Sequence, residues 1–299
     1  MKGRGNPLFS VHLCPHPPLA KRMGGFYFDS VGSWRQNITI LQAIFLGVVQ
    51  GLTEFIPVSS SGHLVFFQSL FGFKKPQLLF DIMLHLGTLM AVGVYFRHDL
   101  WEMARGMRRS LMEKRLDPSA RLLVWIVLAT IPTGLMGILF MDWFESLFSK
   151  PRIVGGMLLI TGLLLWLTRL PKKEGRKIEK MTWIDSILIG IAQGIAIIPG
   201  ISRSGTTIAT GLFRGLDREL AGKFSFLLSI PAILGATVLE FRKMGSPGEA
   251  GINLLGMAVA FGVGIFSLKF LMKIIKNGRV SVFSYYCWAV GLVIIFATK

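Results

Sequence analysis

Two short polar segments carry most of the side chains that could do chemistry in this chain. The first, QGLTEFIPVSSSGH (50–63), holds a carboxylate at Glu54, a hydroxyl at Ser60 and an imidazole at His63. These groups can supply a base or metal ligand, a nucleophile and a proton carrier. The second, PGISRSGTT (199–207), holds Arg203, whose guanidinium can contact two phosphate oxygens at once. Together the segments predict a site for a phosphate group.

The second segment has the composition of an anion cradle. Gly200 permits close backbone approach, and Ser202 and Ser204 add hydroxyl donors on either side of Arg203. A helix that follows such a turn points its N-terminal amides and the positive end of its dipole at the anion.

A divalent cation is one way to use the first segment. Gln50 lies one helical turn before Glu54, so the two side chains share a helix face. A magnesium or calcium ion held by Glu54 and Gln50 would neutralise a diphosphate and polarise the bond that breaks. Glu54 could instead act directly as a base, and the composition does not choose between these two roles.

Structural explanations exist for each of these residues taken singly. Serines in membrane helices often serve close packing, which is an alternative for Ser59, Ser61 and Ser204. Glu54 and Arg203 could form a purely structural ion pair. His63 could be a packing or capping residue. The grouping of all of them in two related turns favours a functional site.

Two other polar pairs give weaker signals. Asp81 and His85 in FDIMLHLGT are spaced to share a helix face, which also fits an interfacial pair without a chemical role. In FSFLLSIP, we expect Ser225 and Ser229 to bond locally within a kinked packing helix.

The chain that carries these segments is too apolar for a soluble domain. Of its 299 residues 52% are hydrophobic, and its mean hydropathy is +0.57, so we predict an all-α polytopic membrane protein. Apolar runs of spanning length predict six transmembrane helices. They lie at 77–96, 121–141, 153–170, 219–240, 252–275 and 281–298.

Two further apolar runs, 38–57 and 184–199, end in a proline followed by small residues. Pro57 and Pro199 should each stop a helix, because proline removes a backbone donor and disfavours helix in the preceding residue. Irregular backbone at membrane depth survives only where protein or a wet cavity satisfies it. We therefore predict two re-entrant helical hairpins whose turns line a pocket.

The two polar turns are copies of one element. Six residues of the first copy match the second at a constant spacing of 143 residues, namely Gly47, Gln50, Gly51, Ser59, Ser61 and Gly62. Repeat one would cover 39–170 and repeat two 184–299. Three full spans per copy invert the second copy, so we predict an inverted-topology repeat whose turns meet near the membrane midplane. Ser60 aligns with Arg203, so the copies differ at their reactive groups.

The formal charge of +17 follows the loops of a membrane protein. Basic residues concentrate around 97–121, 169–180 and 269–279, which predicts cytoplasmic connections there. No basic face interleaved with aromatic residues indicates nucleic-acid binding. Cys14 and Cys287 belong to no cysteine cluster, so neither a disulfide framework nor a zinc site is expected. Residues 1–38 are predicted to form a poorly ordered extension, with Met23 as an alternative start.

The motifs QGLTEFIPVSSSGH and PGISRSGTT resemble those of the undecaprenyl-diphosphatase family, bacterial integral-membrane enzymes associated with bacitracin resistance. The resemblance covers about 39–299. It implies hydrolysis of undecaprenyl diphosphate to undecaprenyl phosphate and inorganic phosphate, which recycles the lipid carrier for cell-wall synthesis. It also implies a bacterial inner-membrane location with a site that opens toward the periplasm. A homodimer is compatible with the Gly-rich and Ala-rich spans but is not required.

Carried over by motif, the resemblance implies catalytic roles for Glu54, Ser60, His63 and Arg203. The residues expected to bind substrate are Gln50, Ser59, Ser61, Gly200, Ser202, Ser204 and Thr207. The first acidic position of the family motif is Gln50 here, which weakens any model with two carboxylates on one metal. An anion transporter or carrier-lipid flippase is the alternative function, because inverted repeats with broken helices are common in transporters.

Overall fold

The structure, a computed structural model, describes residues 26–28, 34–36, 38–73, 77–148, 150–169, 175–241 and 250–297. The chain divides into two units, 1–39 and 40–299. In the first, strand β1 (Phe26–Phe28) pairs antiparallel with strand β2 (Trp34–Gln36). This pair was not predicted, and most of the remainder of the expected extension 1–38 lies outside the described residues.

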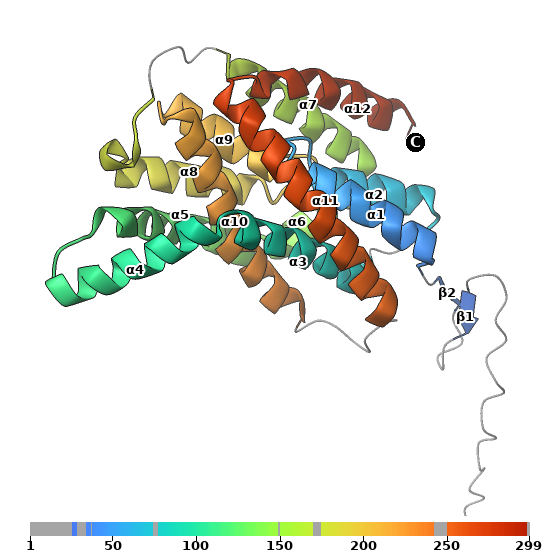
Figure 1. The fold of residues 1–299 in the computed structure, drawn as a ribbon. Helices are drawn as coiled ribbons and strands as arrows, with labels where there is room; N and C mark the ends of the chain where they lie inside the picture. The colour runs from blue at the N-terminus through green and yellow to red at the C-terminus, as the bar shows by residue number, and fades with distance from the viewer. Residues whose placement is uncertain are drawn as a thin grey trace, which may run out of the picture. The chain divides into compact units, whose positions relative to one another are not determined.

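The second unit is helical throughout its described part (Figure 1). Repeat one contains α1 (Ile40–Thr53), α2 (Ser60–Leu70), α3 (Leu78–Tyr95), α4 (Arg97–Glu113), α5 (Arg121–Leu139), α6 (Met141–Phe148) and α7 (Pro151–Leu167). Repeat two contains α8 (Trp183–Ile195), α9 (Arg203–Phe213), α10 (Arg218–Phe241), α11 (Ala250–Lys276) and α12 (Phe283–Ala297). Three short 3-10 helices, η1 (Pro118–Ala120), η2 (Ile178–Lys180) and η3 (Val280–Val282), precede α5, α8 and α12.

The described helices include five that are long and apolar enough to cross a membrane. They are Leu78–Tyr95, Pro118–Leu139, Arg218–Leu239, Ala250–Lys276 and Val280–Ala297, which match five of the six predicted spans. The sixth predicted span, 153–170, corresponds to α7, which is bent by 103° from α6 and counts as a span only if that pair is taken together. The described helices therefore indicate a polytopic membrane protein with five to six candidate spans.

The helices before the two polar turns are too short to cross a membrane. Helix α1 has 14 residues and α8 has 13, which corresponds to roughly 20 Å at about 1.5 Å per residue against a hydrocarbon core of about 30 Å. Both helices end before the expected proline, α1 at Thr53 and α8 at Ile195. Each is followed, after its turn, by an 11-residue helix, α2 or α9.

Each short helix packs against a long helix of the other repeat: α1 lies on α11, and α8 lies on α5. Matched glycines make both contacts. A Cβ at Gly47 would lie 2.9 Å from the Gly256 carbonyl oxygen, and the equivalent Gly190 approaches the Ala129 carbonyl oxygen even more closely. One turn later, Gly51 approaches the Ala260 carbonyl oxygen in the same way, whereas its equivalent Gly194 packs against the Met136 side chain. The copies therefore dock alike at the first of the two glycines and differ at the second.

Helices α7 and α12, the last of each repeat, lie side by side (Figure 1). They cross at two glycines, since a Cβ at Gly155 would lie 2.8 Å from the Gly291 carbonyl oxygen and a Cβ at Gly291 would lie 2.8 Å from the Gly155 carbonyl oxygen. Small residues at such a crossing let two backbones approach.

We expect Gly155→Leu to lower the free energy of unfolding by about 1–3 kcal/mol, because a side chain there overpacks the α7–α12 contact. The matched control is Gly156→Leu, since a Cβ at Gly156 meets nothing within 4 Å. Thermal unfolding of both variants in detergent, followed by near-UV circular dichroism, measures the difference. Equal midpoints for the two variants would show that this crossing does not limit stability.

Candidate active site

The Glu54 carboxylate is the centre of the polar cluster. One oxygen, Oε1, accepts a 2.6 Å hydrogen bond from Arg203 Nη2. The other, Oε2, accepts from Ser60 Oγ at 2.6 Å and from Gln50 Nε2 at 3.1 Å. The side chains of Glu54 and Arg203 are only 6% and 16% exposed. The structure thus brings together the acid and the alcohol of repeat one and the guanidinium of repeat two.

The first turn holds Glu54 and Ser60 on the same side. It closes where Glu54 N–H donates to the Gln50 carbonyl at 2.9 Å, beyond the last residue of α1. Ser59 has a φ of 67°, which is uncommon for a residue with a side chain and stores backbone strain next to the site. From there α2 begins at Ser60, and the Ser59 hydroxyl accepts from Gly62 N–H as the helix cap.

The second turn is held from outside by α7. The Thr161 hydroxyl donates to the Gly200 carbonyl at 3.0 Å and accepts from Ser202 N–H at 3.0 Å. Gly200 has a φ of 94°, and a side chain there would collide with the Val154 carbonyl, so only glycine fits. Helix α9 then begins at Arg203, with Ser202 as its cap.

The two turns touch each other. A Cβ at Gly62 would lie 3.7 Å from Gly200 Cα, and a Cβ at Gly205 would lie 3.2 Å from Pro57 Cβ. Ser60 and Arg203 are the first residues of α2 and α9. Both helices therefore present their N-termini, with free amides and a partial positive charge, at the cluster. An anion at this place would meet two helix N-termini and a guanidinium.

His63 lies in the site but does not contact Ser60 or Glu54 by hydrogen bond. Its Nδ1 lies 2.8 Å from the Ser59 carbonyl oxygen, and its Nε2 lies 2.9 Å from the Tyr286 hydroxyl. A carbonyl only accepts, so Nδ1 donates and neutral His63 accepts the Tyr286 proton at Nε2. Both ring nitrogens are engaged, and Glu54 is left as the acceptor closest to the Ser60 proton.

The remaining predicted site residues hold the turns. Ser59 and Ser61 share a hydroxyl contact of 3.3 Å. Ser202 and Ser204 make the equivalent contact at 3.3 Å. Thr207 donates to the Arg203 carbonyl at 2.8 Å.

Two residues contact the site although the sequence analysis did not place them there. His85 reaches it, with Nε2 3.7 Å from Glu54 Oε2, although the pair with Asp81 gave only a weak signal. The expectation that Ser225 bonds locally is wrong: its hydroxyl lies 2.5 Å from Thr207 Oγ1, and its carbonyl accepts from Arg203 Nη1 at 3.4 Å. Ser229 does bond locally, to the Phe226 carbonyl.

A repeat alignment extended past the turns points to both segments but not to the same position in each. At a spacing of 144 residues, Phe80, Leu84 and His85 align with Phe224, Leu228 and Ser229, and Asp81 aligns with Ser225. The first long span of each copy therefore places a side chain at its own polar turn from a different position, His85 on α3 and Ser225 on α10.

The described residues contain no group of three or more His, Cys, Asp and Glu side chains that could hold a metal ion. One observation does fit a cation: Gln50 Oε1 is buried and has no hydrogen-bond partner. With Glu54 it offers two oxygen ligands, and a hard cation can take the others from phosphate and water.

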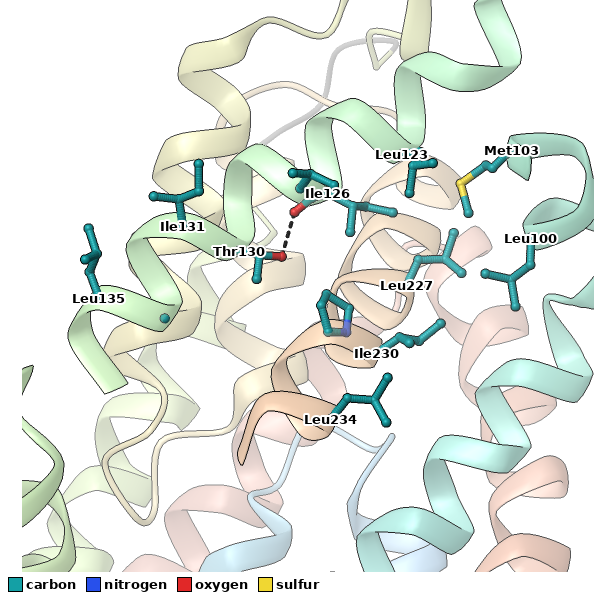
Figure 2. A pocket seen from close by; sticks show the side chains of 13 residues that line it. Leu100, Met103, Leu123, Ile126, Thr130, Ile131, Leu135, Leu227, Ile230 and Leu234 are labelled. Carbon is teal, nitrogen blue, oxygen red and sulfur yellow. Dashed lines mark hydrogen bonds between the residues drawn. The ribbon is translucent and has the colours of Figure 1, made fainter. Parts of the chain in front are cut away.

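An apolar groove of about 550 Å³ lies apart from this cluster, between α4, α5 and α10 (Figure 2). It contains none of the predicted site residues. The hydroxyl of Thr130 in its wall donates to the Ile126 carbonyl at 2.8 Å. The groove therefore offers no group that could bind a phosphate.

The fold and the site define a polytopic membrane protein with a buried polar cluster built from two related turns. Residues 43–293 match the family model described as Bacitracin resistance protein BacA, and the chain belongs to that family.

Curated relatives agree with this assignment. A protein from Desulfatibacillum aliphaticivorans is 45% identical over 270 residues, which cover 86% of this chain and 98% of the relative. One from Carboxydothermus hydrogenoformans is 46% identical over 260 residues, or 85% and 95% of the two chains. One from Methanobrevibacter smithii is 43% identical over 267 residues, or 85% and 96%. All three are named undecaprenyl-diphosphatase.

We expect Thr161→Val to lower the free energy of unfolding by about 1–3 kcal/mol, because it leaves the buried Gly200 carbonyl and Ser202 N–H without a partner. Thr130→Val is the matched control, since the Thr130 hydroxyl bonds only within its own helix. Denaturant titration in detergent compares the two variants. A Thr161→Val protein as stable as the control would mean that α7 does not hold the second turn.

Proposed function

We propose that this protein hydrolyses undecaprenyl diphosphate to undecaprenyl phosphate and inorganic phosphate, and so recycles the carrier lipid for cell-wall polymers. The names of its relatives support the reaction. The single structural observation that carries it is the Glu54 carboxylate, which receives the Ser60 hydroxyl from one repeat and the Arg203 guanidinium from the other. The Ser60 hydroxyl as nucleophile, the Glu54 carboxylate as its base and the Arg203 guanidinium as the phosphate-binding group are therefore adjacent.

Ser60 Oγ attacks the terminal phosphorus, and its proton passes to Glu54 Oε2, 2.6 Å away. The bond from that phosphorus to the bridging oxygen breaks, and undecaprenyl phosphate leaves with the electron pair. Arg203 and the N-terminal amides of α2 and α9 stabilise the equatorial oxygens. Glu54 then releases that proton to solvent, and water attacks the phosphoserine while Glu54 takes one of the water protons. The bond from phosphorus to Ser60 Oγ breaks, Ser60 Oγ takes the proton from Glu54, and inorganic phosphate leaves.

Attack by a water molecule that Glu54 activates is the alternative mechanism. In that case Ser60 only orients the carboxylate. His63, held between Ser59 and Tyr286, serves to orient α2 and its cap in either mechanism.

A magnesium or calcium ion fits the site as a cofactor held by Glu54 and the unpaired Gln50 Oε1 together with phosphate oxygens. When bound, it would neutralise the diphosphate and act as a Lewis acid.

We infer that α1–α2 and α8–α9 are re-entrant hairpins of an inverted-topology repeat. The short lengths of α1 and α8 support this arrangement. So does their packing, because α1 packs against α11 and α8 against α5, each in the other repeat. The basic residues around 97–121 and 169–180 support a cytoplasmic location for those connections, in the inner membrane of a bacterium, with the site opening to the periplasm. A homodimer remains a proposal that the Gly-rich spans permit.

A transporter of anions or a flippase for the carrier lipid is the second candidate, favoured by the broken helices alone. The test that separates the two is release of inorganic phosphate from undecaprenyl diphosphate by detergent-purified protein. We expect phosphate release, with loss in EDTA and recovery with added magnesium or calcium. A protein that releases no phosphate under any of these conditions would favour the transport function. Activity that is unchanged by EDTA would contradict the proposed role of a divalent cation.

Ser60→Ala should lower kcat for phosphate release at least about a thousandfold, because the nucleophile of a covalent mechanism is lost. Ser61→Ala, one residue away, should retain most activity, since the hydrogen bond of its hydroxyl within the described residues is to the Ser59 hydroxyl and not to Glu54. Single-turnover measurements on both variants provide the comparison. A Ser60→Ala protein with near wild-type kcat would establish the water mechanism instead.

Arg203→Lys should lower kcat at least about tenfold, although it keeps the positive charge. The arginine uses two separate nitrogens to contact Glu54 and the Ser225 carbonyl, and the same two nitrogens can bind two phosphate oxygens. A lysine has a single nitrogen and cannot reproduce this bidentate geometry. Arg203→Ala should lose more. Parallel kinetics of the two variants test this, and full activity in the lysine variant would reduce the role of Arg203 to charge alone.

A further inference from the structure

Helix α4 directly follows the candidate membrane span α3 and contributes no residue to the polar cluster. Phe96 ends α3 and precedes α4, so no loop separates α4 (Arg97–Glu113) from a membrane-spanning helix. Of its 17 residues only Met103 and Gly106 are buried. Gly106 packs against η1, where a Cβ would lie 2.9 Å from Ala120 N. The opposite face of α4 is left exposed.

That exposed face alternates apolar and basic side chains. Trp101, Arg105, Arg108 and Met112 are spaced at i, i+4, i+7 and i+11, so they form one stripe along the helix. We call these four residues the α4 stripe. Trp101 is 59% exposed and Met112 is 73% exposed. The Arg105 guanidinium lies over the Trp101 ring, 4.9 Å from its centroid.

Two of the nearby acidic groups are neutralised by basic side chains, whereas Glu102 and Glu113 of α4 are exposed and neither forms an ion pair with Arg105 or Arg108 in the described part of the chain. Asp99 pairs with Lys223 on α10 at 2.5 Å, and Asp117 pairs with Arg109 at 2.8 Å. Within the part of the chain that the structure describes, Arg105 and Arg108 form no ion pair with a carboxylate. Their charges are therefore free to meet anions from outside.

We propose that the α4 stripe binds the phosphate headgroups of anionic phospholipids. A helix that joins a membrane span and exposes tryptophan and methionine between arginines matches the interfacial helices that insert apolar side chains below the headgroups. Arginines at that depth keep their charge at headgroup level while their stems contact acyl chains. A soluble polyanion would use the charges but leave Trp101 and Met112 in water, so a lipid surface is the better fit.

The test is native mass spectrometry of the purified full chain titrated with dioleoylphosphatidylglycerol or dioleoylphosphatidylcholine. The double variant Arg105→Gln/Arg108→Gln should weaken phosphatidylglycerol binding about thirtyfold, because each of the two basic residues contributes of order 1 kcal/mol near a lipid surface. Phosphatidylcholine binding should change less than twofold. Arg105→Lys/Arg108→Lys keeps both charges and should retain wild-type selectivity.

The matched control removes two exposed charges elsewhere, as Lys273→Gln/Arg279→Gln, and should alter phosphatidylglycerol binding less than threefold. Phosphate release in detergent should be unchanged in all these variants, which verifies that each is folded. Equal losses in the two neutralised pairs would show a diffuse charge effect and overturn the proposal. Unchanged phosphatidylglycerol binding in the α4 variant would overturn it as well.

Discussion

The ion pair between Glu54 and Arg203 is the constraint on which the site depends. Burying either charge alone would be costly, and together they satisfy each other only if the two turns meet. A 2.6 Å contact between residues 149 positions apart therefore fixes the relation of the two repeats. The same ion pair orders the Arg203 guanidinium and the Glu54 carboxylate before substrate binds. In the proposed mechanism a diphosphate would therefore meet its binding cation and the base for Ser60 in fixed positions.

Glycine is what allows that meeting. Gly47 and Gly51 on α1, and Gly190 on α8, bring each short helix against the backbone of the opposite repeat, and Gly194 on α8 makes room for the Met136 side chain. Short helices can end inside the protein because their turns are satisfied there, by Thr161 for Gly200 and Ser202 and by the Ser59 and Ser202 caps. If the two hairpins are re-entrant, as proposed, this packing would let their turns lie at a membrane depth that a lipid-exposed turn could not occupy.

The sequence predicted this centre because its signals are local and duplicated. Proline after an apolar run located both turns, and the divergence of Ser60 from Arg203 indicated unequal roles. What it could not supply was the partner of His63, since Tyr286 lies 223 residues away on another helix and nothing local marks it. The cross-helix contact of Ser225 with Thr207 was missed for a different reason: a serine in a helix ordinarily bonds to its own backbone.

The proposed chemistry depends on two different residues at equivalent positions of the two copies. Ser60 and Arg203 occupy the same place in their copies, the first residue of a helix that follows a turn capped by serine, and both side chains contact Glu54. In the proposed mechanism that place holds a nucleophile in one copy and a cation in the other. Because each also lies at the positive end of a helix dipole, an anion between the turns would be bound from both sides while only one side could attack it. A symmetric pair of turns would lack one of the two groups, since it would contain either two serines without a guanidinium to bind phosphate or two guanidiniums without a nucleophile.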